Sequence, residues 1–76
     1  MSYEEFKNIV SLLQSPDEEV VELGRQLFPK PPGWHMFGYK NMTELMHGGR
    51  TYMFFMHTIS FNESEIKQLY ANIFGI

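Results

Sequence analysis

The stretch Arg50–Phe61, RTYMFFMHTISF, decides how the rest of the chain can fold. It is the most apolar and aromatic part of the sequence, and its only permanent charge is Arg50. Such a segment must be largely buried, either in the protein's own core or beneath a partner, because exposed apolar surface is unfavourable in water. Whether it forms a helix or a strand separates the two fold classes open to this chain.

The residues of this stretch fit both conformations. Apolar side chains recur at helical spacing, at Tyr52, Phe55, Met56 and Ile59. Residues that favour strands are equally frequent, at Thr51, Tyr52, Phe54, Phe55, Thr58 and Ile59. A strand would need a partner, for which Trp34–Tyr39 is the candidate, and a two-stranded hairpin is marginally stable by itself. We therefore favour a helix.

The segments on either side have helix signals. Upstream, Asn41–Glu44 has the pattern of a capping box and predicts a short helix through about His47, which Gly48-Gly49 would end. Downstream, Asn62–Glu65 is another capping box, with Phe61 and Ile66 at the spacing of a hydrophobic staple. The last helix would end at Gly75. The apolar side chains along one of its faces would be Ile66, Leu69, Tyr70 and Ile73.

The N-terminal part predicts two helices. Ser2–Glu5 is a capping box, and the apolar spacing after it predicts a helix over Tyr3–Gln14. A second helix is predicted over Pro16–Phe28, with Ser15 as its cap and Pro16 at its first position. Gly24 lies on its apolar face, which indicates a close approach by another helix. The very short linker predicts an αα-hairpin, and the prolines of residues 29–33 would end it.

One part of this hairpin resembles known proteins. Leu12–Leu27, LLQSPDEEVVELGRQL, resembles the helix openings of HEAT-like α-helical pairs, and it is also similar to small accessory proteins of tailed phages and bacteria. The resemblance covers about 16 of the 76 residues and implies a helical pair. No second copy follows, so a repeat array is not expected. No functional residue is carried over from it.

These elements predict a fold class. We expect residues 1–76 to form a single all-α domain, in which the N-terminal hairpin is joined through the proline-rich loop to a second helical unit. The alternative is an α+β domain in which Trp34–Tyr39 and Arg50–Ile59 form a short β-hairpin.

Composition and charge narrow the function classes. The net charge is −3, and it is unevenly distributed: residues 1–28 carry −4 and residues 29–61 carry +2. An acidic first part argues against nucleic acid as a partner. The absence of cysteine excludes disulfides and thiolate metal sites. No apolar run approaches the roughly 20 residues that a membrane span needs, so we expect no membrane and a cytoplasmic protein.

No catalytic, cofactor or metal site is predicted. The spacing of His35, His47 and His57 matches no compact zinc motif. Residues 48–51, GGRT, lack the pattern of a phosphate-binding loop. His57 and Ser60 could touch on a helix, but no acid is placed to orient the imidazole. We therefore do not expect an enzyme.

The middle third of the chain indicates a binding function. It holds five of the six methionines and seven of the twelve aromatic residues. Methionine adapts to irregular partners, and aromatic residues with scarce positive charge are typical of interface hot spots. We expect an interaction module, accessory or inhibitory, that binds an unidentified protein through Trp34, Phe37, Tyr39, Lys40 and Arg50. A small nucleic-acid-binding protein and a self-associating structural protein are the alternatives, and whether this cluster is core or interface stays open.

Overall fold

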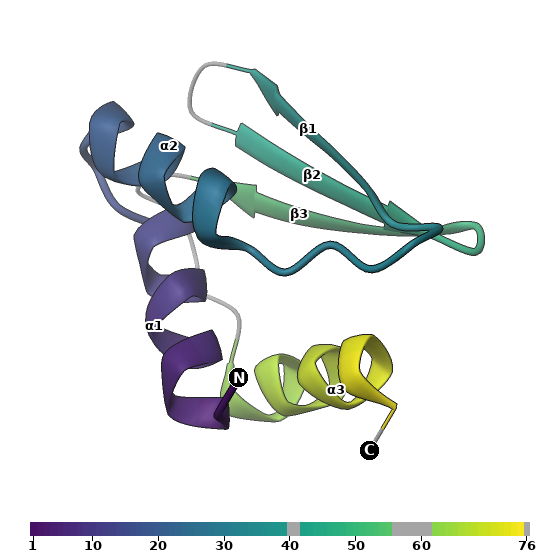
Figure 1. The fold of residues 1–76 in the computed structure, drawn as a ribbon. Helices are drawn as coiled ribbons and strands as arrows, with labels where there is room; N and C mark the ends of the chain where they lie inside the picture. Colours follow the sequence, from purple (N-terminus) through teal and green to yellow (C-terminus); the bar gives the residue numbers. More distant parts are fainter. Residues whose placement is uncertain (40–41, 56–61, 76) are drawn as a thin grey trace.

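The computed structural model describes residues 1–39, 42–55 and 62–75, excepting the side chains of Tyr39, Phe54 and Phe55. Within them the chain forms, in order, α1 (Tyr3–Leu13), α2 (Glu18–Leu27), β1 (His35–Tyr39), β2 (Met42–His47), β3 (Arg50–Phe55) and α3 (Glu63–Phe74) (Figure 1). The three strands make one antiparallel sheet in the order β1-β2-β3. The protein is therefore α+β, and the all-α prediction is wrong.

The error begins at β2. The Asn41–Glu44 pattern predicts a helix opening, but Met42–His47 is the central strand of the sheet. Thr43 and Leu45 are fully buried, two residues apart, as a strand with one covered face requires. Gly48-Gly49 is not a helix stop: with φ of 56° and 81° it is the two-residue loop of a β-hairpin, of the kind whose twist matches the flanking strands.

The alternative prediction had the right fold class but the wrong pairing. Trp34–Tyr39 and Arg50–Ile59 do contain the edge strands β1 and β3, as far as the described residues reach. These strands do not pair with each other, since each pairs with β2. A third strand between them removes the objection that a two-stranded hairpin is marginal.

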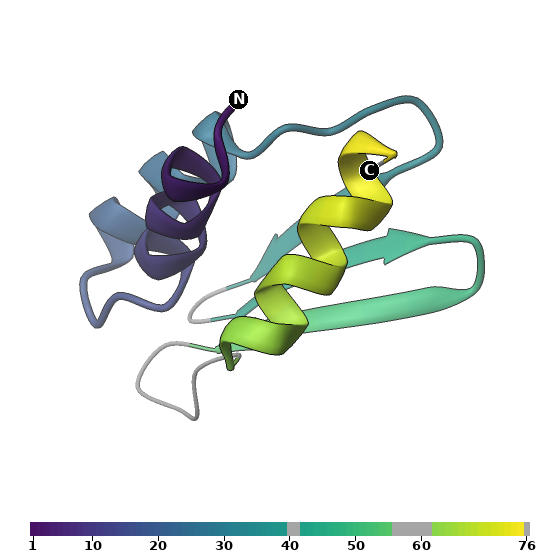
Figure 2. The ribbon, with the colours of Figure 1, turned by 90° about the horizontal axis from the view of Figure 1, so that it is seen from below.

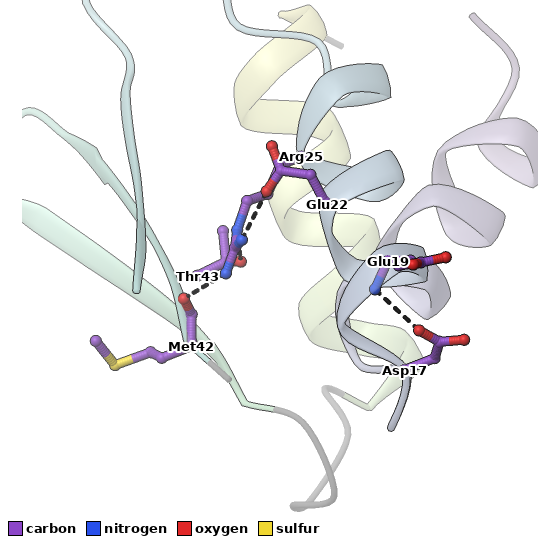
Figure 3. Close-up of polar contacts among 6 residues, drawn as sticks. All are labelled: Asp17, Glu19, Glu22, Arg25, Met42 and Thr43. Atoms are coloured by element: carbon purple, nitrogen blue, oxygen red, sulfur yellow. Dashed lines mark hydrogen bonds and ion pairs between the residues drawn. The ribbon is translucent and has the colours of Figure 1, made fainter. Parts of the chain in front are cut away.

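The helices follow their capping signals closely. The Ser2 hydroxyl of α1 accepts from the Glu5 N–H, as predicted. Helix α3 begins at the predicted Asn62 capping box and ends at Gly75 with φ of 70°, whereas Phe61 of the predicted staple lies outside the described residues. Helix α2 begins later than predicted: Asp17, not Ser15, is its cap, and the Asp17 carboxylate accepts from the Glu19 N–H at 2.9 Å (Figure 3).

Helices α1 and α2 form the predicted hairpin, and they approach each other closely at Gly24. A Cβ added at Gly24 would lie 3.0 Å from the Leu12 Cβ and 3.1 Å from the backbone nitrogen of Leu13. These distances are shorter than ordinary carbon contacts of about 3.5–4.0 Å. The glycine that weakens α2 therefore allows the two helices to pack closely.

The helices all lie on one side of the sheet. Helix α3 crosses one face of it, and the α1–α2 hairpin lies beside α3 at one end of the strands (Figures 1 and 2). We call the covered side the inner face; its described side chains are Met36, Thr43, Leu45, His47, Arg50 and Tyr52. The hydrophobic core lies between this face, α1 and α3, and contains Phe6, Ile9, Val10, Leu13, Phe28, Trp34, Leu45, Ile66, Leu69 and Ile73.

Arg25 joins α2 to the sheet (Figure 3). Its Nε donates to the Thr43 hydroxyl at 2.8 Å, and its Nη2 donates to the Met42 carbonyl at 2.9 Å. Its Nη1 pairs with Glu22 at 2.9 Å. The buried Thr43 hydroxyl is thereby satisfied, and a Cβ at Gly38 would lie only 2.5 Å from the Arg25 Nε. Gly38 thus provides the space through which the guanidinium reaches β2.

A surface ion pair joins α1 to α3. The Lys7 ammonium donates to the Glu63 carboxylate at 3.3 Å, and both side chains are exposed. The hydrogen bond to Glu63, followed by its charge, raises the pKa of Lys7 above its ordinary value of 10.5. Because water screens exposed charges, this pair should contribute little to stability.

Candidate functional site

The side of the sheet opposite the helices carries an apolar surface. We call it the outer face, and its described side chains are His35, Phe37, Met42, Glu44, Met46, Thr51 and Met53, which alternate with those of the inner face. No described helix covers it (Figures 1 and 2). A sheet with helices on one side leaves its other side to water or to a partner.

Among the described side chains of the outer face, three large apolar ones are exposed, one on each strand. Phe37 is 57% exposed, Met53 is 40% exposed and Met46 is 36% exposed. An open face of an antiparallel sheet usually carries polar side chains that alternate with the buried ones. This face departs from that pattern. Clustered exposed apolar residues are a recognised mark of interaction surfaces, whereas isolated ones are not.

Glu44 lies in the middle of this surface. The strand register places it directly opposite Phe37 on one side and Met53 on the other. The side chain is half-buried, and among the described residues its carboxylate makes no ion pair or hydrogen bond. The outer face therefore presents one unpaired acid between two exposed apolar side chains.

A second feature lies at the β2–β3 turn. A shallow polar cleft there is lined by His47, Gly48, Arg50, Tyr52 and Asn72. The His47 ring stacks on Trp34 at 4.2 Å between centroids with 7° between the planes, and the Asn72 amide donates to the Tyr52 hydroxyl at 3.4 Å. The cleft faces the C-terminal end of α3, on the other side of the sheet from the apolar surface.

A third feature lies on the helical hairpin. Leu23 and Leu27 of α2 are about half exposed. Leu27 also borders a mostly apolar groove, which is lined by Met1 and, from α1, by Ile9 and Leu12. This groove is a separate apolar surface on a different part of the molecule, so it offers a natural comparison for the outer face.

The structure does not bring the five predicted binding residues together. Phe37 is exposed on the outer face, whereas Arg50 lines the cleft at the turn. Trp34 is only 8% exposed and belongs to the core, where its stacking on His47 and Tyr52 fixes the ring. The side chain of Tyr39 and the whole of Lys40 lie outside the described residues.

Glu44, Met46 and Met53 are the outer-face residues that matter most beside Phe37, and none of them was predicted as a binding residue. Met46 and Met53 counted only toward the methionine content of the middle third, and Glu44 only as a helix cap. The missed signal is the alternation in Met42–His47, which places Thr43 and Leu45 on one face and Glu44 and Met46 on the other. Once that segment is a strand, the register puts the three residues on one surface.

The described part of the chain assembles no metal-binding group of three or more His, Cys, Asp or Glu side chains. The His57 and Ser60 pair considered from the sequence lies outside the described residues. No described helix combines the length and apolar character needed to cross a membrane.

Comparison of the chain with known protein families, curated proteins and solved structures found no match. These comparisons therefore add no relative to the resemblance of Leu12–Leu27 to helical pairs, and no residue's role can be transferred from a known protein. The function has to be argued from the surface itself.

Proposed function

We propose that this chain is a non-enzymatic protein-interaction module that binds a partner protein through the outer face. The observation that supports the proposal is the exposure of Phe37, Met46 and Met53 together on a side of the sheet that no described helix covers. Phenylalanine supplies a rigid apolar anchor, and methionine adapts its shape to the partner.

The energy available on this surface suits a reversible complex. Full burial of a Phe or Met side chain contributes about 1.5–3 kcal/mol. Because the three side chains are already partly covered, each should contribute at the lower end of that range. Together they would supply roughly half of the about 8 kcal/mol that micromolar binding represents. The remaining free energy would come from the rim of the surface and from polar contacts.

Nucleic acid fits this surface less well than protein does. Binding to nucleic acid depends on Lys and Arg side chains that neutralise phosphates. The described side chains of the outer face include no Lys or Arg, and Glu44 stands at their centre. Arg50 lines the cleft on the other side of the sheet. Nothing in the described residues joins a cationic surface to the exposed apolar one.

The test compares two double variants in affinity capture from the native cell. Phe37→Ser with Met53→Ser removes two anchors of the outer face. Leu23→Ser with Leu27→Ser removes two side chains of similar exposure from α2, and serves as the matched control. Thermal melting of both variants checks that each is folded before capture.

The proposal predicts that one protein is captured by the wild type and the Leu23/Leu27 variant but lost with the Phe37/Met53 variant. If only the Leu23/Leu27 variant lost the captured protein, the partner would bind at α2 and the helical groove instead of the outer face. Equal capture by all three proteins would contradict the proposal.

A further inference from the structure

We infer that the partner docks an amphipathic helix on the outer face and that a lysine or arginine in the helix's apolar stripe pairs with Glu44. This inference rests on the proposed function and specifies the chemistry of the partner. It is carried by the position of Glu44 in the register, opposite Phe37 and Met53. Directly opposed residues on neighbouring strands have Cβ atoms about 4.5–5.5 Å apart, so anything that covers the two anchors must also cover the acid.

Covering this carboxylate without a partner charge is unfavourable. An ionised group that leaves water must be paired or hydrogen-bonded, and its attraction to an opposite charge strengthens as water is excluded. A purely apolar partner would therefore bind the two anchors while losing the hydration of Glu44. A partner that carries Lys or Arg at the same place would keep the apolar contacts and gain a charge-assisted hydrogen bond.

Among the described residues, no Lys or Arg makes an ion pair with Glu44. Lys7 pairs with Glu63 between α1 and α3, and Arg25 is held on the inner face by Thr43. Arg50 lines the cleft on the helical side of the sheet. The charge that complements Glu44 is therefore expected from the partner.

A second copy of this chain is a poor occupant for the same surface. In a two-fold dimer the same patch meets itself across the axis. A patch centred on Glu44 would then bring two carboxylates together, and like charges at such a distance resist burial. The one central acid thus acts against self-association through the outer face and favours a partner of opposite charge.

The dimensions of the sheet suit a helix. The two edge strands β1 and β3 lie on either side of β2, so they are about 10 Å apart. An α-helix with its side chains is about 10–12 Å across. A single helix along β2 would contact Phe37 on one edge and Met53 on the other, with its central residue above Glu44.

The test uses a displayed library of 18-residue helical peptides that share an apolar stripe, with one central stripe position varied over all twenty amino acids. Selection is on the wild-type chain, with counter-selection on the folded Phe37→Ser, Met53→Ser variant. We expect Lys and Arg to be enriched at the varied position over Leu and Glu. The selected Lys peptide should bind Glu44→Gln at least tenfold more weakly than wild type, and its Lys→Glu form should bind Glu44→Lys better than wild type.

The outcomes separate this inference from the proposed function. Binders that need Phe37 and Met53 but show no preference for Lys or Arg, and bind Glu44→Gln as tightly as wild type, would overturn the inference alone. A selection that yields no binder dependent on Phe37 and Met53 would contradict the docking surface itself. Thermal melting of Glu44→Gln and Glu44→Lys confirms that a change in affinity does not come from unfolding.

Discussion

Gly38→Ala tests how the helical hairpin is attached to the sheet. The added methyl would lie 2.5 Å from the Arg25 Nε, 2.6 Å from its Cζ and 2.9 Å from its Cδ. Ordinary contacts are about 3.5–4.0 Å, so the guanidinium would have to move by about 1 Å. That movement breaks the hydrogen bonds to the Thr43 hydroxyl and the Met42 carbonyl, which are 2.8 and 2.9 Å long.

The expected loss follows from those two bonds. Hydrogen bonds from a charged donor contribute about 1.5–3 kcal/mol each. The Arg25 side chain is 16% exposed and can recover some hydration after it moves, so the loss should be about 3–4 kcal/mol for both. Replacing glycine by alanine within a strand returns about 0.5–1 kcal/mol. The net destabilisation should therefore be about 2–3.5 kcal/mol.

A double-mutant cycle with Arg25→Met isolates this contact. In that background Gly38→Ala meets no guanidinium, so it should be neutral or stabilising by up to about 1 kcal/mol. Urea unfolding followed by the fluorescence of Trp34, the one tryptophan of the chain, measures all four proteins. A coupling below about 0.5 kcal/mol, which is the scatter of independent sites, would refute the proposed role of Gly38.

Three further predictions concern the hairpin, the ion pair and the outer face. Gly24→Ala should destabilise by about 1–3 kcal/mol despite its better helix propensity, because its methyl meets the backbone of α1; urea unfolding would show a neutral or stabilising effect if the approach is looser. Since Glu63 raises the pKa of Lys7, the stability from this pair is present below pH 10.5 and is lost as the pH rises through the folded-state pKa. The difference in stability between wild type and Lys7→Met should therefore shrink in alkaline unfolding curves, and a constant difference would contradict the pairing. Phe37→Ser with Met53→Ser should change the free energy of unfolding by less than about 1 kcal/mol, because both side chains are exposed; a large loss in urea unfolding would show that they belong to the core.

Local signals in the sequence predict the helices well. Ser2, Asn62 and Gly75 each act through neighbours within a few residues, so their capping roles can be deduced without a tertiary structure. Gly24 is similar, because its place on an apolar helix face already indicates close packing. The predicted cap of α2, Ser15, was wrong: Asp17 also has a side chain that can cap a helix, and the folded backbone places Asp17 at the cap position.

The sheet could not be predicted in the same way. Residues 41–44 have the pattern of a capping box, whereas the strand conformation of Met42–His47 depends on pairing with both neighbours. Those neighbours, β1 and β3, are themselves ambiguous apolar segments. The preference for a helix over Arg50–Phe61 followed from judging one possible strand partner at a time. With three strands the pairing becomes mutually supporting.

The candidate binding surface could not be predicted either, because it depends on the sheet. Aromatic and methionine content points to the middle third of the chain, but only the register shows which of its residues share a face. Phe37 is exposed and Trp34 is buried, although the two are close in sequence and similar in character. The sequence also could not predict that Arg25 holds the hairpin to the sheet, because its hydrogen bonds are to β2, which is distant in the sequence.

The most direct test of the docking surface is to record NMR spectra of ¹³C-labelled methionine methyl groups. The chain is titrated with the protein that the wild type captures, and the shift and broadening of each methyl signal are measured. Met46 and Met53 report on the outer face, Met36 packs against the core and Met1 borders the helical groove. We predict that the Met46 and Met53 signals shift or broaden on binding while those of Met1 and Met36 stay in place. A shift of Met1 with Met46 and Met53 unchanged would contradict the outer face as the binding surface.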